Sequence, residues 1–309
     1  MPSTETKPNY LDPRVLAKIQ RLDLRARLIV EGFMSGQHRS PFHGFSVEFA
    51  SHREYTQGDE LKHIDWKLFS RTDNYFIKQY EQETNLAAYL LLDISESMRY
   101  RGEKSPFSKF DYAASAAAAL AFLVTQQSDS VGLALFDDEL RKYLPTSANP
   151  IQLQNIVHEF EIAEPKQKTR VDKIFHDLAE KLHKKEMVIL ISDLFVPLDS
   201  LFDGLAHFRH KKHEVVVLHI LDEDELKFPF EGNTLFRGLE QLPQLMIEPR
   251  SLREAYLDVF NRFCADVKRR CAKQQVDYRL INTTETLDVA LATFLAARAA
   301  RAKLGGMKR

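Results

Sequence analysis

The sequence is poor in cysteine, glycine and proline, and each shortage narrows the class of protein. Its 309 residues include 2 cysteines, 11 glycines and 12 prolines. So few glycines and prolines exclude collagen-like, low-complexity and largely disordered chains. Cys264 and Cys271 stand seven positions apart on a predicted helix, about 10 Å of helical rise, whereas a disulfide needs Cα atoms within about 7 Å. We therefore expect free thiols that serve in packing, as in a reducing compartment.

Net charge of one sign and long apolar runs are also lacking. With 43 Lys and Arg against 44 Asp and Glu, the formal net charge is −1, so no overall field attracts nucleic acid or anionic lipid. The longest apolar run, Ala113 to Val124, is shorter than the roughly 18–20 residues that cross a bilayer. Met1–Pro8 has no apolar core of a secretory signal. We expect a cytoplasmic protein with no membrane span and no nucleic-acid partner.

From Ala87 onward, short apolar runs alternate with amphipathic helical windows, which predicts a parallel sheet covered by helices. The predicted parallel strands are Ala87–Asp93, Val131–Phe136, Met187–Ser192, Glu214–Leu221 and Asp277–Ile281, with Leu140–Leu144 as an antiparallel edge strand. The predicted helices are Lys109–Gln126, Ile151–Phe160, Val171–Lys184, Leu198–Arg209, Leu252–Gln274 and Leu287–Ala302. Several strands are apolar without alternation, as expected when helices cover both faces. The fold class is therefore α/β, with a doubly wound, mostly parallel sheet.

The first 86 residues have a different pattern and are predicted to form an N-terminal extension. Asp12 is placed to cap a helix over Pro13–Glu31, with Pro13 at its first position. After an irregular stretch, Phe76–Gln82 alternates like a strand, and a turn at Thr84-Asn85 could pair it with Ala87–Asp93 as a hairpin. We therefore divide the chain into an extension (1–86), an α/β domain (87–302) and a basic tail (303–309).

Oxygen-bearing side chains follow the ends of two predicted strands. Asp93, Ser95 and Ser97 come directly after an apolar strand, and Asp193 follows another. The carboxyl ends of strands in an open α/β sheet form the ligand crevice, and a carboxylate with two hydroxyls suits Mg²⁺ better than a soft metal. Thr169 is the natural further hydroxyl donor, with Thr146 as a competitor.

These residues resemble the metal-ion-dependent adhesion site (MIDAS) of von Willebrand factor A domains: a D-x-S-x-S loop, then a threonine, then an aspartate. A second resemblance covers most of the chain from about Gly32 to Arg298. The segment from Arg53 to Lys67, followed by Ser70-Arg71, looks like the hallmark of the bacterial family called domain of unknown function 58. Further matches are Leu221-Asp222, Glu225, Phe228-Pro229-Phe230 and the C-terminal helices.

The family resemblance implies a von Willebrand factor A core with an N-terminal extension. It also implies cooperation with a MoxR-type AAA+ ATPase in maturing or remodelling other proteins. Carried over residue by residue, the metal ligands are Asp93, Ser95, Ser97, Thr169 and Asp193, although Lys168 replaces the family-typical glycine before the threonine.

The ligand set predicts binding rather than hydrolysis. With few carboxylates and several neutral hydroxyls, a bound Mg²⁺ (or Mn²⁺ or Ca²⁺) keeps excess positive charge and can recruit a carboxylate from a protein partner. The first alternative is a metal-dependent phosphohydrolase with Asp93 as nucleophile, which usually has a carboxylate two positions on, where this chain has Ser95. The second alternative is a scaffold whose metal site is empty.

Two other groups of residues are interpreted as structural. His207, His210 and His213 recur every three positions, but Arg209 and two lysines stand between them and would repel a cation. They therefore predict a solvated helix end rather than a metal site. A further group, Arg53, Asp65 and Arg71, could form an ion network that joins the extension to the core.

Overall fold

The computed structural model describes residues 12–37, 52–54, 75–78, 86–167, 171–182, 185–236, 244–289, 291–293 and 295–296. The chain forms two compact units, one made of Met1–Ser35 with Leu86–Arg309 and the other of Gly36–Asn85. The predicted extension is thus divided between them. In the smaller unit, β1 (His52–Glu54) pairs antiparallel with β2 (Phe76–Lys78).

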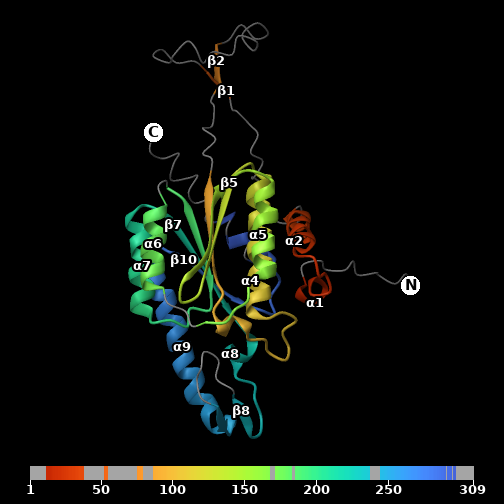
Figure 1. The fold of residues 1–309 in the computed structure, drawn as a ribbon, viewed down its shortest axis with the longest axis vertical. Coiled ribbons are helices and arrows are strands. Elements are labelled where there is room, and N and C mark those ends of the chain that lie inside the picture. The colour runs from red at the N-terminus through yellow and green to blue at the C-terminus, as the bar shows by residue number, and fades with distance from the viewer. Residues whose placement is uncertain are drawn as a thin grey trace, which may run out of the picture. The chain divides into compact units, whose positions relative to one another are not determined.

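A six-stranded sheet forms the centre of the larger unit, as predicted (Figure 1). Its strands, in spatial order, are β10 (Asp277–Asn282), β7 (Glu214–Leu221), β6 (Met187–Ser192), β3 (Ala87–Asp93), β4 (Ser130–Phe136) and β5 (Leu140–Ser147). All neighbours are parallel except β4 and β5, which are antiparallel. Because β4 and β6 take both edges of β3, the predicted hairpin with β2 is not formed.

The strand order reverses between β3 and β6, and this position locates the candidate site. From β3 the chain moves to β4 and β5 on one side, and then to β6, β7 and β10 on the other. Such a switch point leaves a crevice at the carboxyl ends of the two strands, because their connections leave in opposite directions. Asp93 ends β3, and Ser192 ends β6.

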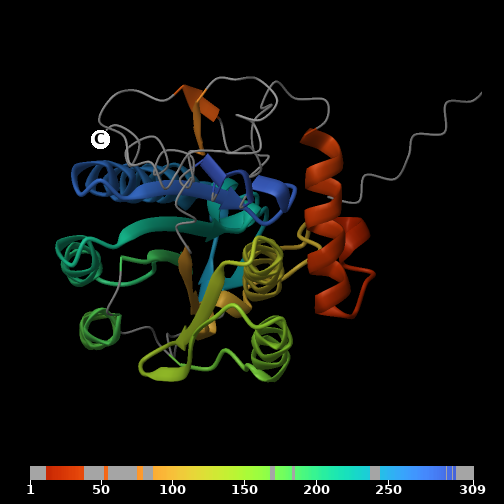
Figure 2. The same cartoon turned by 90° about the horizontal axis from the view of Figure 1, so that it is seen from above.

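Alternate strand residues enter two separate apolar cores, one on each face of the sheet. In β3, Leu90 and Leu92 pack in one core, whereas Tyr89 and Leu91 pack in the other. The first face is covered by α4 (Lys109–Gln126) and α5 (Ile151–Ile162), and the second by α6 (Asp172–Lys181), α7 (Leu198–His210) and α9 (Pro249–Lys273) (Figure 2). The small-residue run of α4 is almost wholly buried, which allows this helix to pack closely on the sheet.

The predicted helix from Pro13 to Glu31 is instead two helices, α1 (Pro13–Leu16) and α2 (Leu22–Gln37). Asp12 caps α1 as predicted, since its Oδ1 accepts a hydrogen bond of 2.8 Å from the backbone of Arg14. Between the helices, Arg25 Nη2 donates to the free carbonyl of Ile19 at 2.6 Å, which compensates for the interrupted helical bonds. α2 packs on α4 through the first apolar core, with Arg25 Nη1 also bonded to Ser115.

Short elements follow β7 at the carboxyl end of the sheet. They are α8 (Glu223–Lys227), β8 (Thr234–Phe236) and β9 (Leu245–Ile247), and the last two pair antiparallel. The predicted helix 287–302 is described only in part, with helical residues at 288–289, 291–293 and 295–296. Among the residues that the structure describes, no helix combines the length and apolar content needed to cross a bilayer.

Candidate metal centre

The loop after β3 brings three of the predicted ligands together. Backbone N–H of Ser95 donates to Asp93 Oδ1 at 2.8 Å, and the hydroxyls of Ser95 and Ser97 are 2.9 Å apart. The short 3₁₀ helix Glu96–Arg99 starts in this loop, so the alternate side chains of 93, 95 and 97 turn toward one side. All three residues are buried. The loop therefore brings one carboxylate and two hydroxyls together, with little of any of the three residues exposed.

The end of β6 adds two more oxygen-bearing side chains to this place. Ser192 Oγ donates to Asp93 Oδ2 at 2.6 Å, and the next residue is Asp193, which is fully buried. Burial and then the negative charge of Asp193 raise the pKa of Asp93 to about 7, against the opposing effect of bonds from Ser192 and Ser95. Two carboxylates thus repel each other at the switch point.

Lys109, which the sequence analysis did not single out, is the cation at this centre. Its ammonium lies 2.8 Å from Asp193 Oδ2 and 2.6 Å from Glu225 Oε1, and its side chain is 0% exposed. It also lies 4.7 Å from the centroid of the Phe195 ring. Burial lowers the pKa of Lys109, but Asp193 and Glu225 outweigh this effect and the pKa is raised. The lysine is therefore charged and holds the Asp193 carboxylate.

One sequence signal could have identified Lys109. It is the first residue of α4, after the capping Ser108, and a cation at a helix N-terminus is opposed by the helix dipole. A lysine in that position therefore needs carboxylate partners. Their identity could not be read from the sequence, since Asp193 and Glu225 lie 84 and 116 positions away.

Asp222, one of the family-matching residues, fixes the loop before α4. Its carboxylate accepts hydrogen bonds from Gly102 N (3.1 Å), Ser105 Oγ (2.6 Å) and Thr283 Oγ1 (2.9 Å). Asp222 also caps α8. Its backbone N–H donates in turn to Glu225 Oε2, and the two bonds form a capping box. Asp222 is thus a structural anchor that holds Glu225 toward Lys109.

His219 and a group of aromatic rings close the other side of the centre. His219, buried on β7, lies with Nε2 2.9 Å from the carbonyl of Asp193 and Nδ1 2.8 Å from the Tyr278 hydroxyl. Burial lowers the pKa of His219 to about 4, so the ring is neutral at physiological pH. The rings pack around this side in pairs, and they are Phe195, Phe228, Phe230, Phe236, Tyr256, Phe260 and Phe263. The family-matching phenylalanines at 228 and 230 therefore serve in packing.

The two candidate threonines differ in what the structure says of them. Thr169 lies outside the described residues, but Gln167, two positions earlier, forms a bridge with Ser95 and accepts a bond of 2.8 Å from Glu96 N. Thr146 lies on β5, where its backbone N–H donates to the Tyr89 hydroxyl at 3.2 Å. Because Tyr89 is four residues before Asp93 on β3, Thr146 is too far from the loop to be a ligand.

The interpretation of the three histidines needs a correction. His210 is exposed, but His213 is 1% exposed, so the predicted solvated end does not include it. His213 faces inward because its Nδ1 accepts a bond from Glu186 N and its ring packs edge-on to Phe208. Cys264 and Cys271 are free thiols as predicted, and burial raises the pKa of Cys271 to about 12. The predicted network of Arg53, Asp65 and Arg71 lies outside the described side chains.

The donor chemistry at the switch point fits a hard divalent cation. Asp93, Ser95 and Ser97 offer only oxygen atoms, the ligands that Mg²⁺ and Ca²⁺ prefer. A cation beside Asp93 would also relieve the repulsion from Asp193 that raises the pKa of Asp93. Asp193 is bonded to Lys109, so its carboxylate is shared between the lysine and any metal.

Solved structures with a similar fold are known. The chain resembles the conserved hypothetical protein BatB from Bacteroides thetaiotaomicron with a TM-score of 0.50 and 18% identity, over 71% of this chain and 99% of that one. The von Willebrand factor A domain of SpRpn10 is matched with a TM-score of 0.40 and 12% identity, over 67% and 94% of the two chains. The chain has an α/β fold like that of BatB, with a mostly parallel central sheet covered by helices.

The sequence places the protein more narrowly. Residues 51–262 match the family described as "Protein of unknown function DUF58", and the chain belongs to that family. Curated relatives include the uncharacterized proteins Rv1480 of Mycobacterium tuberculosis and Mb1516 of Mycobacterium bovis. Each is 24% identical over 264 residues, which make up 84% of this chain and 81% of the relative.

Proposed function

We propose that the protein is a non-enzymatic interaction module that binds a protein partner through a Mg²⁺-dependent site of the adhesion type. The observation that carries this proposal is the gathering of Asp93, Ser95 and Ser97 at the switch point, next to Asp193. Mg²⁺ held there by one carboxylate and neutral hydroxyls would retain positive charge, and an acidic side chain of a partner would complete its coordination. Mn²⁺ or Ca²⁺ could replace it.

Exposed apolar side chains beside this end of the sheet favour a protein partner over a small molecule. Leu245 and Met246 of β9 are 53% and 67% exposed, and Val259 of α9 is 66% exposed. Phe228, which ends α8, stacks on Phe236 of β8 and packs on Tyr256 of α9. These elements therefore lie together and carry exposed apolar side chains, which are typical of protein interfaces.

The resemblance to the family suggests the class of partner, a MoxR-type AAA+ ATPase or the client that such an ATPase remodels. With such a partner, we propose that the protein acts in the cytoplasm. Hydrolysis is not favoured by the centre, since position 95, where a haloacid-dehalogenase-like enzyme has its acid, is a serine bonded to another serine.

Metal titration followed by a binding measurement tests the proposal. Isothermal titration of the full chain with Mg²⁺ should give one site, which Asp93→Ala abolishes. Asp129→Ala is the matched control, because Asp129 is a buried aspartate directly before β4, where it accepts a bond from Leu86 N. A purified MoxR-type ATPase from the same organism should then bind in Mg²⁺ and not in EDTA.

Two results would overturn the proposal. Equal affinity for the ATPase in Mg²⁺, in EDTA and with Asp93→Ala would show that no metal ion bridges the two proteins. Phosphatase turnover that requires Mg²⁺ and disappears in Asp93→Asn would assign the centre to catalysis instead.

A further inference from the structure

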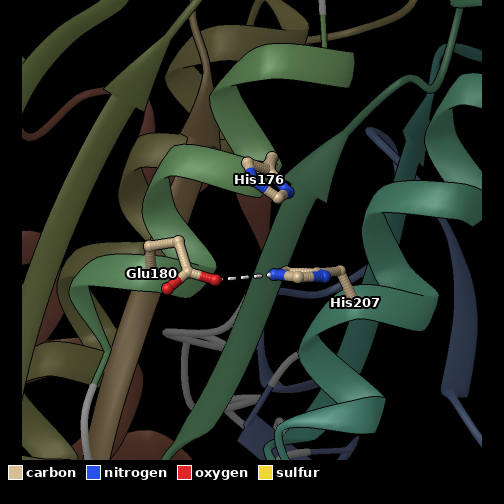
Figure 3. A group of neighbouring side chains, drawn as sticks. All are labelled: His176, Glu180 and His207. Carbon is tan, nitrogen blue, oxygen red and sulfur yellow. Dashed lines mark hydrogen bonds and ion pairs between the residues drawn. The ribbon is translucent and has the colours of Figure 1, made fainter.

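A second group of metal-ligating side chains lies on the face of the sheet covered by α6 and α7, away from the oxygen ligands. His176 and Glu180 stand one turn apart on α6, and His207 faces them from α7 (Figure 3). Their candidate ligand atoms all lie within 4.8 Å of one another. His207 Nε2 is 3.2 Å from Glu180 Oε1, and the two imidazole rings have centroids 4.6 Å apart.

These separations are close to those of a metal site. Zn²⁺ binds imidazole nitrogen and carboxylate oxygen at about 2.0–2.2 Å, so two ligands at a tetrahedral angle are about 3.3–3.5 Å apart. The pair formed by His207 and Glu180 already has this spacing. The third atom must move by about 1 Å, which a rotamer adjustment supplies because His176 and Glu180 are exposed.

The backbone that carries the cluster is held rigidly from below. Phe175 and Phe208, the chain neighbours of His176 and His207, are buried and pack with ring centroids 5.8 Å apart. Gly204, one turn before His207, allows the close approach of the helices, since a Cβ there would lie 2.8 Å from Phe175 Cβ. The two histidines are thus set opposite each other by core packing, as a preorganised site requires.

We propose that His176, Glu180 and His207 form a binding site for a transition-metal dication of the Zn²⁺ class. Two imidazoles and one carboxylate are a donor set that selects Zn²⁺, Co²⁺, Ni²⁺ or Cu²⁺ over Mg²⁺. A hollow beside the cluster is lined by His176, Asp203 and His207, and Asp203 stands one turn before His207 on α7. The site is separate in place and in chemistry from the centre at Asp93.

Lys211 forms an ion pair with one of the proposed ligands, Glu180. Its ammonium lies 2.8 Å from Glu180 Oε1, so it competes with a metal for the carboxylate. Removal of the lysine charge, with its stem retained in Lys211→Met, should strengthen metal binding.

Co²⁺ titration of the full chain tests the proposal, with the absorption spectrum and isothermal titration as readouts. Excess Mg²⁺ keeps the first centre out of the measurement. We expect one Co²⁺ per chain, with affinity reduced at least about tenfold by His176→Asn or His207→Asn. His210→Asn is the matched control, since His210 is an exposed histidine on the same helix.

The variants change exposed or half-exposed side chains, so thermal melting in EDTA should match that of the parent protein and exclude misfolding. Tighter Co²⁺ binding by Lys211→Met would give independent support. Equal affinity in His176→Asn, His207→Asn and the control would overturn the proposal. Thiolate-to-cobalt absorption would also overturn it, because Cys264 or Cys271 would then be the ligand.

Discussion

The ammonium of Lys109 lies 2.8 Å from Oδ2 of Asp193, and neither side chain is more than 1% exposed. A lysine on α4 therefore already neutralises the carboxylate that the family pattern assigns to the metal. This contact makes the centre a buried ion network whose charge a divalent cation would change. Removing a member of such a network should have a large effect, since an unpaired buried charge is costly.

Replacement of Lys109 by methionine should destabilise the protein by about 3–5 kcal/mol in EDTA, because it leaves Asp193 and Glu225 buried without their cation. Urea unfolding measures the loss. Excess Mg²⁺ should restore part of it, as the metal then gains Asp193. Lys142→Met is the control, since its 2.7 Å pair with Glu159 is partly exposed and should contribute less than about 1 kcal/mol. An equal loss in Mg²⁺ and EDTA would show that the metal does not use Asp193.

Asp93→Asn should leave the protein folded and remove its stabilisation by Mg²⁺. The amide retains an acceptor for Ser95 N and removes the charge that repels Asp193. In EDTA the melting temperature should therefore equal or exceed that of the parent, and added Mg²⁺ should raise only the parent's. Asp129→Asn should still respond to Mg²⁺. If Mg²⁺ raised the melting temperature of Asp93→Asn as much as that of the parent, Asp93 would be excluded as a ligand.

Stability should fall in mild acid because of His213. Burial lowers the pKa of this ring, so as the pH falls through about 6.5 the unfolded chain takes up a proton that the folded chain refuses. The stability that the neutral His213 ring contributes is fully present above its pKa in the unfolded chain. It is lost as the pH falls from there toward the lower pKa of the folded chain. His213→Asn keeps an acceptor for Glu186 N and should show a smaller loss between about pH 7.5 and 5.5 in urea unfolding. His210→Asn should behave like the parent, and identical slopes for all three proteins would contradict the assignment.

Gly102→Ala should destabilise the loop before α4. An added Cβ would lie 2.1 Å from Asp222 Oδ1, and that carboxylate cannot turn away because Ser105 and Thr283 hold it. We expect a loss of about 1–3 kcal/mol in urea unfolding. Gly232→Asn is the comparison, because a Cβ there meets nothing within 4 Å and asparagine tolerates a positive φ. A loss at position 102 no larger than at 232 would show that Asp222 is free to move.

The parts of the fold that the sequence predicted are those with a strong local pattern. β3, β6 and β7 cover the predicted residues because apolar residues dominate each of them. The interruption between α1 and α2 was missed, since the apolar spacing continues through it and the compensating bond comes from Arg25. The predicted pairing of β2 with β3 was also wrong, because the partners of a strand depend on the order of the whole sheet.

At the candidate centre, too, only the residues that share a local pattern could be predicted. Asp93, Ser95 and Ser97 belong to one loop, so their spacing was enough to bring them together. Lys109 and the pair His176 and His207 were missed because each depends on side chains that meet only after the helices pack. A regular spacing in the chain favoured His207, His210 and His213 as a group, whereas the structure joins His207 to another helix.

β5 lies at one edge of the six-stranded sheet and is poorly suited to pair with a strand of another chain. Pro145 offers no N–H to an incoming strand, Arg141 and Lys142 place charge along it, and its register with β4 is irregular at two points. Strand addition, which many proteins use to capture extended peptides, is therefore disfavoured on this side. Growth into a continuous ribbon of molecules is blocked there as well.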